Sequence, residues 1–190
     1  VETGAAPDNY FRPEARPYTR APRDRYLGRN ILEMDLQLLV DAVAFVARFE
    51  SPISIGDLVK ATSAAFGTRA GSRIKARLDE AIREAIRQRR LVEDRGFCRE
   101  ASVVCELRNR AGTGIGAEGI APEEYRLALM SILEQGKPFA RELLVAEVRD
   151  VFGYGAASAA LKENVLGTVE ELIALGRIGE GATGLAWRER

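Results

Sequence analysis

Arginine and lysine side chains gather between Arg69 and Arg90, at positions from which they could bind phosphate groups. The same stretch carries an apolar residue every four positions, at Ile74, Leu78, Ile82 and Ile86. That spacing predicts an amphipathic helix whose arginines face away from the apolar stripe. Cationic groups along an exposed helical face are typical of surfaces that contact the backbone of nucleic acids.

The basic helix and the short segment after it supply the expected DNA-binding residues. They are Arg69, Arg73, Lys75, Arg77, Arg83, Arg87, Arg90 and Arg95. On a recognition helix, Arg69 and Arg73 would lie nearest the base edges, and the later arginines would contact phosphates. The competing interpretation is a solvated face, because Glu80 and Glu84 lie three residues from several arginines and can form weak ion pairs with them.

The residues needed for common catalytic sites are missing from the sequence. Histidine is absent, which excludes Ser-His-Asp and Cys-His catalysis and removes the commonest zinc ligand. Cys98 and Cys105 have no metal-ligand spacing and are expected to be reduced. The glycines of residues 112–119 lack the strand and lysine of a phosphate-binding loop. We therefore expect no catalytic residue, no metal, no cofactor and no enzymatic activity in this chain.

The elements around the basic helix predict its fold. Residues 34–49 and 55–66 have helical apolar spacing, and Pro52 separates them. After the basic helix, residues 91–98 are long enough only for a tight hairpin that turns at residues 94–96. Helix, break, helix, basic helix and hairpin together predict a winged helix-turn-helix domain.

The same pattern occurs a second time. Residues 144–153 match residues 58–67 at an offset of 86, and residues 161–178 match residues 74–91 at an offset of 87. The predicted fold is therefore mainly α with short β-hairpins, in two tandem winged helix-turn-helix domains. We expect the first domain at residues 34–107, a Gly-rich linker at 108–121 and the second domain at 122–190.

The two copies differ in charge. Residues 51–112 hold 13 Lys/Arg against 8 Asp/Glu, whereas residues 113–190 hold 8 against 12, although the whole chain is neutral. The face that matches the basic helix in the second copy carries small and acidic residues. The first copy is thus the expected DNA reader, and the second a protein contact or a spacer.

An extended arm is expected at residues 1–33. It holds four of the seven prolines, together with tyrosines and arginines. Proline prevents a continuous helix there. Docking of its aromatic side chains on the folded body is favoured over a basic arm that touches nucleic acid, because Asp8, Glu14 and Asp24 dilute its positive charge.

Scattered positions between residues 35 and 180 resemble a known family. They are residues 49–55, Phe66-Gly67, Arg73-Ile74, Ala81-Ile82, residues 90–92 and Phe97, then residues 120–124, Phe152-Gly153 and residues 176–178. The chain resembles the domain of unknown function at the C-terminus of bacterial superfamily I helicase-like proteins, which often carry a very-short-patch-repair-type nuclease domain. The resemblance implies an accessory domain of a DNA-processing enzyme. The second copy departs from the family because residues 153–157 lack its basic residue.

The expected function is therefore non-catalytic binding of duplex or junction DNA through the first domain, within a larger helicase- or nuclease-type protein. The second domain would contact a protein partner or other domains of the parent protein. Two alternatives remain open, a protein-protein interaction module and a stand-alone transcription regulator. No apolar run is long enough to span a bilayer, so we expect a cytoplasmic protein without a membrane partner.

Overall fold

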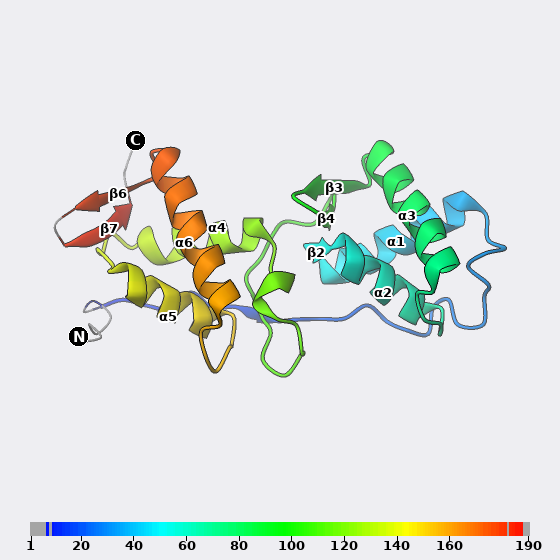
Figure 1. Ribbon diagram of the computed structural model, residues 1–190, viewed down its shortest axis with the longest axis horizontal. Helices are drawn as coiled ribbons and strands as arrows, with labels where there is room; N and C mark the ends of the chain where they lie inside the picture. Colours follow the sequence, from blue (N-terminus) through cyan, green and yellow to red (C-terminus); the bar gives the residue numbers. More distant parts are fainter. Residues whose placement is uncertain (1–6, 8, 182, 188–190) are drawn as a thin grey trace. The chain divides into compact units, whose positions relative to one another are not determined.

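The computed structural model describes residue 7, residues 9–181 and residues 183–187 (Figure 1). This part of the chain is mainly α-helical with short strands, as the sequence predicts. The backbone divides into two compact units. The α1–α3 unit is Thr19–Cys105, and the α4–α6 unit takes in the described residues of Val1–Tyr18 and Glu106–Arg190.

The α1–α3 unit has three helices and a small antiparallel sheet. Its elements are α1 (Leu36–Glu50), β2 (Ile53–Ser54), α2 (Ile55–Ala65), α3 (Ser72–Arg87), β3 (Leu91–Asp94) and β4 (Phe97–Glu100), with strand order β2-β4-β3. Asp35 caps α1, since its side chain accepts a hydrogen bond of 2.7 Å from the Gln37 N–H. The hairpin turns at Arg95-Gly96, both with positive φ, which suits a two-residue turn.

The α4–α6 unit has the same order of elements. They are α4 (Pro122–Leu133), α5 (Arg141–Val151), α6 (Ala159–Ala174), β6 (Ile178–Gly181) and β7 (Gly184–Trp187), after a short 3₁₀ turn, η1 (Ala117–Gly119). In place of β2 there is a single bridge between Phe139 and Leu185. A side chain at Gly184 would put its Cβ 2.6 Å from the Phe139 carbonyl oxygen, so this close approach requires glycine.

The bounds of the elements repeat at the two offsets seen in the sequence. α1 and α2 begin 86 residues before α4 and α5, and α3, β3 and β4 begin 87 residues before α6, β6 and β7. The Ile53–Cys98 pair has its counterpart in the Phe139–Leu185 bridge, at offsets of 86 and 87. The extra residue falls in the turn before the third helix, where it leaves the packed elements unchanged.

Each unit has its own apolar core. In the α1–α3 unit the core residues include Leu39, Val43, Leu58, Leu78 and Ile82, all at most 2% exposed. In the α4–α6 unit they include Leu129, Leu144, Val148, Leu161 and Val165, all fully buried. The helical spacing of these side chains is therefore what places each helix on its core.

The N-terminal arm is shared between the units. Residues 9–18 lie on the α4–α6 unit, where β1 (Arg16–Pro17) pairs in parallel with β5 (Arg108–Asn109). Tyr10 packs edge-to-face on Phe139, with ring centroids 5.1 Å apart. Residues 19–33 lie on the α1–α3 unit, where Tyr26 stacks on Phe66 at 4.9 Å. Tyr10 and Tyr26 of the arm thus dock on folded structure, whereas Phe11 is exposed.

The segment expected as a free Gly-rich linker, residues 108–121, is part of the α4–α6 unit. The Arg110 N–H donates a 2.8 Å hydrogen bond to the Phe152 carbonyl, at the end of α5. The Arg110 guanidinium is fully buried and donates to both carboxylate oxygens of Glu124, at 2.8 and 2.7 Å. Arg108 pairs with the same carboxylate, and Tyr18 of the arm lies over both guanidinium groups.

One local prediction is wrong. The mixture of β-branched and polar residues at 101–107 also predicts a possible further strand, but these residues form a turn and an irregular stretch, and the strand β5 begins at Arg108. Its alternate residues Ala101, Val103, Cys105 and Leu107 are apolar, but only Leu107 is buried, so no packed face orders the segment as a strand.

Candidate nucleic-acid interface

Helix α3 buries one side against the core of its unit. Leu78, Ala81, Ile82 and Ala85 are at most 2% exposed, and Ile74 and Ile86 pack at the edge of the same core. Because these residues recur every three or four positions, the opposite side of α3 faces solvent. This side carries the arginines that the sequence singles out.

Four of the expected DNA-binding residues form what we call the cationic face: Arg69, Arg73, Lys75 and Arg83. All four are exposed, and within the described part of the chain none of them makes an ion pair or a side-chain hydrogen bond. Their charged groups are therefore free to exchange water and counterions for phosphate oxygens.

The start of α3 is electrostatically unfavourable for the helix itself. Its N-cap, Gly71, supplies no side-chain hydrogen bond, and its first turn has no acidic residue. Arg73 and Lys75 instead put positive charge at the positive end of the helix dipole. The matching helix α6 begins with Ser158, whose Oγ accepts from the Leu161 N–H at 3.1 Å. The residues at the start of α3 therefore do not stabilise the helix, and their positive charge favours binding of an anion there.

Two of the expected DNA-binding residues are engaged inside the unit. Arg77 donates to the Met34 carbonyl at 3.0 Å and to Glu80 at 2.6 Å, and its side chain is only 27% exposed. Arg90 forms an ion pair with Asp41 on α1. Both guanidinium groups hold α3 and its end against the N-terminal part of the unit.

Arg87 and Arg95 are exposed but lie beside acidic residues. Arg87 donates two hydrogen bonds to Glu84, at 2.7 and 2.5 Å. These bonds, and one from Gln88, lower the pKa of the Glu84 carboxyl to about 2. Arg95 lies 3.7 Å from Asp94 in the hairpin turn. Such exposed pairs are weak, and their arginines can exchange a carboxylate for a phosphate. Arg87 and Arg95 are therefore weaker candidates for phosphate binding than the residues of the cationic face.

Arg89 is a further exposed cation that the sequence reasoning passed over. It follows α3 directly, has φ 58° and makes no ion pair among the described residues. The sequence indicates that Arg89 lies at the end of the helix with a positive φ, since Arg89 aligns with Gly176 at the offset of 87. Glycine is the residue usual at that position.

The matching side of α6 has a different character. At the offset of 87, Arg73 and Arg83 correspond to Ala160 and Glu170, and only Lys75 has a basic counterpart, Lys162. Glu170 is paired with Arg141. This side of the α4–α6 unit therefore lacks the charge pattern of the cationic face. Trp187 packs on the core of that unit, with Arg177 5.6 Å from its ring centroid.

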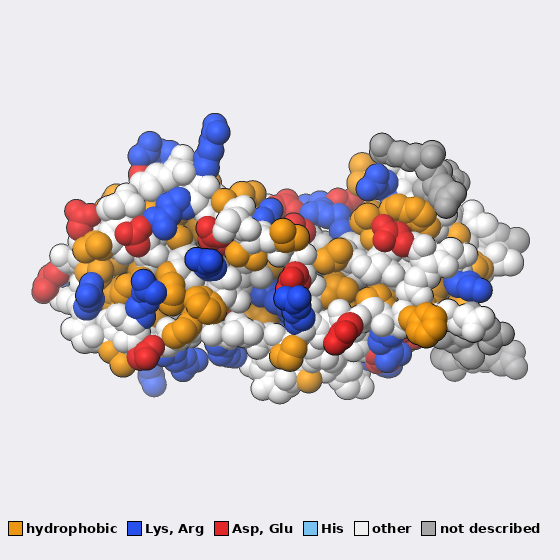
Figure 2. Space-filling model, turned by 180° about the vertical axis from the view of Figure 1, so that it is seen from behind, with side chains coloured by type: hydrophobic (Ala, Val, Ile, Leu, Met, Phe, Trp, Pro, Cys, Tyr) orange, Lys and Arg blue, Asp and Glu red, His pale blue; other side chains and the backbone are white. Residues whose placement is uncertain are grey.

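Charge is mixed over the rest of the surface. On the side drawn in Figure 2, Lys and Arg side chains lie interspersed with Asp and Glu. Among the residues that the structure describes, no three His, Cys, Asp or Glu side chains converge as metal ligands would. None of the helices described is both long and apolar enough to cross a bilayer.

Two comparisons with known proteins identify no relative of this chain. No family model matches the sequence, and a search of the curated proteins finds no match.

Proposed function

We propose that the α1–α3 unit is a winged helix-turn-helix domain that binds duplex DNA through the cationic face of α3. The order helix, strand, helix, helix and hairpin, with sheet order β2-β4-β3, supports this fold. In it α2 and α3 form the helix-turn-helix, and β3 and β4 form the wing.

The observation that carries the proposal is the cationic face itself. Arg69 lies on the turn before α3, Arg73 and Arg83 lie on its outward side, and Lys75 lies on its flank. All four are exposed, and none has a side-chain partner among the residues that the structure describes. A cation held in an internal ion pair loses that pair when it binds phosphate, whereas these four lose only water and counterions. The first two, Arg69 and Arg73, lie at the end of the helix that enters the major groove in this class of domain.

The wider role follows from the family resemblance. An accessory domain of a helicase- or nuclease-type protein needs to hold duplex or junction DNA without chemistry of its own. The absence of histidine from the sequence is consistent with that role. We propose that the α4–α6 unit is a second winged helix-turn-helix that does not read DNA.

The test is a salt titration of the full chain against a fluorescent duplex. Replacing Arg83 with alanine should lower affinity for all sequences and flatten the slope of log affinity against log salt by about one unit. Replacing Arg73 as well should lower affinity further and relax the base preference. The fold should be unchanged by circular dichroism, because neither side chain lies in the core.

Lys75 and Lys162 provide a matched control pair. They occupy equivalent positions, and both are exposed. Lys75→Ala should flatten the slope by about one unit and Lys162→Ala should leave it unchanged. Equal effects of the two substitutions would indicate unspecific attraction, and no effect of the Arg73/Arg83 double substitution would refute DNA binding by this face.

A further inference from the structure

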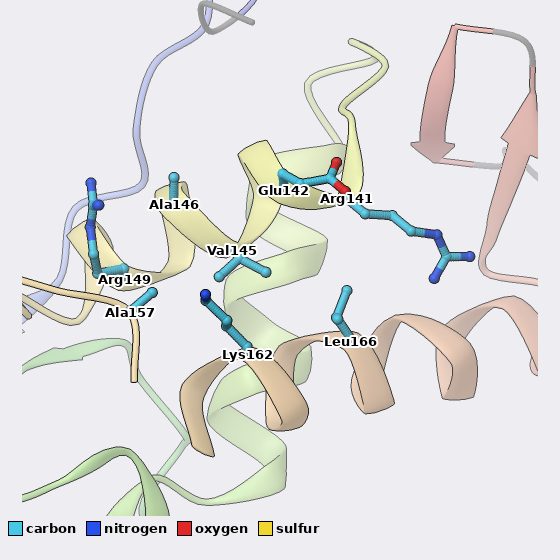
Figure 3. A pocket seen from close by; sticks show the side chains of 8 residues that line it. All are labelled: Arg141, Glu142, Val145, Ala146, Arg149, Ala157, Lys162 and Leu166. Carbon is cyan, nitrogen blue, oxygen red and sulfur yellow. The ribbon is translucent and has the colours of Figure 1, made fainter. Parts of the chain in front are cut away.

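A groove lies between α5 and α6, on the unit that we exclude from DNA reading (Figure 3). Its volume is about 360 Å³. Four of its eight lining residues are apolar, namely Val145, Ala146, Ala157 and Leu166, and three are basic, namely Arg141, Arg149 and Lys162. Figure 3 shows Val145, Lys162 and Leu166 with their side chains directed into the space between the two helices. A groove of this size admits a large apolar side chain.

Val145 belongs to the apolar core of the unit and Ala157 packs against it, whereas Ala146 and Leu166 lie outside that core. Leu166 is 36% exposed, although Leu161, Val165 and Val169 on the same helix are fully buried. A leucine that stays in contact with water forgoes the free energy that burial would provide. Leu166 therefore contributes to a surface and not to the fold.

The equivalent positions of the other unit are polar. At the two offsets, Ala146 corresponds to Lys60 and Leu166 corresponds to Asp79. Lys60 lies across the outer side of α2, where it pairs with Asp57 at 2.9 Å. The small Ala146 and the apolar Leu166 thus open and line the groove at the places where the other unit carries charge.

The charged residues of the groove indicate which charge a ligand should carry. Lys162 makes no ion pair among the described residues, and Arg149, paired with Asp150, is 31% exposed. Lys162 lies near Ala157 and is directed into the groove, whereas the Arg149 side chain is directed away from Lys162 (Figure 3). At the opposite end, the Arg141 guanidinium turns away to Glu170 and Glu180, which leaves Glu142 there. A ligand therefore meets positive charge at one end and apolar side chains in the middle.

We propose that the α5–α6 groove binds an acidic amphipathic peptide helix. A large apolar side chain of the peptide inserts between Val145 and Leu166, and a carboxylate one or two turns away pairs with Lys162. Helices bind protein grooves in this way, through apolar anchors at helical spacing. The proposal is independent of DNA binding by the α1–α3 unit.

The test uses the full chain and a display library of random peptides of about 16 residues, which allows four helical turns. The enriched peptides should combine a leucine or an aromatic residue with Asp or Glu on neighbouring turns. For a fluorescent copy of an enriched peptide, Leu166→Asp should raise Kd by about tenfold or more. Lys162→Glu should also raise Kd, and an Asp/Glu→Lys version of the peptide should bind the variant better than the wild type.

Leu175→Asp is the matched control. Leu175 is 59% exposed at the end of α6 and does not line the groove, so its substitution should leave Kd unchanged. The proposal is overturned by failure to enrich peptides, by enrichment of basic peptides, or by equal effects of the Leu166 and Leu175 substitutions. It is also overturned if duplex DNA displaces the peptide, or if Leu166→Asp dissolves a dimer in sedimentation, since the occupant would then be DNA or a second copy.

Discussion

At the scale of single residues, Glu124 is the carboxylate on which the N-terminal part of the α4–α6 unit depends. It is fully buried and pairs with both Arg108 and Arg110. One carboxylate thus faces two guanidinium groups, and the rings of Tyr18 and Phe152 lie within 6 Å of Arg110. These rings offer cation–π contacts that help to accommodate the surplus charge.

Removing the charge of Glu124 should therefore be costly. Glu124→Gln removes the charge of the carboxylate that two buried guanidinium groups share, and we expect it to lower the free energy of unfolding by about 3–5 kcal/mol. Urea denaturation followed by circular dichroism measures this change.

The control for Glu124 is Glu171, which pairs with Arg126 at 3.0 Å in a partly exposed position. Glu171→Gln should cost at most about 1 kcal/mol. Similar losses for both substitutions would mean that the buried pair has no special role in stability.

At the scale of elements, the first part of the arm is held to α5 by one arginine. Arg12 donates to Glu147 at 2.8 Å and lies 2.9 Å from Asp150. Glu147 is buried, and its hydrogen bonds and charge raise the pKa of Arg12. Loss of Arg12 leaves a buried carboxylate without its main partner, which is a costly state.

We therefore expect Arg12→Ala to release residues 9–18 from the α4–α6 unit and to cost about 1–3 kcal/mol. Hydrogen exchange should become faster at the backbone N–H groups of Arg16 and Tyr18, which donate to Leu107 and Asn109.

Arg16 on the same arm is the matched control. Its ion pair with Glu106 is largely exposed, with side chains 75% and 50% accessible. Arg16→Ala should lose below about 1 kcal/mol and leave exchange in the arm unchanged. Equal release of the arm by both substitutions would contradict the role given to Arg12.

At the scale of the whole molecule, two cores are formed from matching elements, and a destabilising substitution in one core should leave the other core unaffected. Leu58 and Leu144 occupy equivalent positions on α2 and α5, and both are fully buried. They belong to different apolar clusters. A cavity in one cluster should therefore loosen the elements around it and spare the other cluster.

Leu58→Ala and Leu144→Ala should each cost about 2–5 kcal/mol in the unit that contains them. Hydrogen exchange read by mass spectrometry should show Leu58→Ala exposing α1 and α3 while α6 stays protected, and Leu144→Ala doing the reverse. Loss of protection in both units from one substitution would show a single cooperative unit instead.

The sequence by itself determined the elements and their repetition. The recurrence of Ile74, Leu78 and Ile82 is a local property of the chain, and it predicts α3 because burial requires one apolar face. The turn at Arg95-Gly96 is equally local, since two residues with positive φ close the hairpin without help from distant segments. The ion pair of Arg87 with Glu84 also spans only three residues and was foreseeable.

Only the tertiary structure decided which cations are available and where the arm lies. Arg77 reaches Met34 across 43 residues, and Arg90 reaches Asp41 across 49, so no pattern within one helix separates them from Arg73 or Arg83. The docking of Arg12 on Glu147 spans 135 residues. Helical spacing reports which face a residue occupies, whereas a long-range ion pair depends on how two elements pack, and packing brings together charges that the sequence leaves far apart.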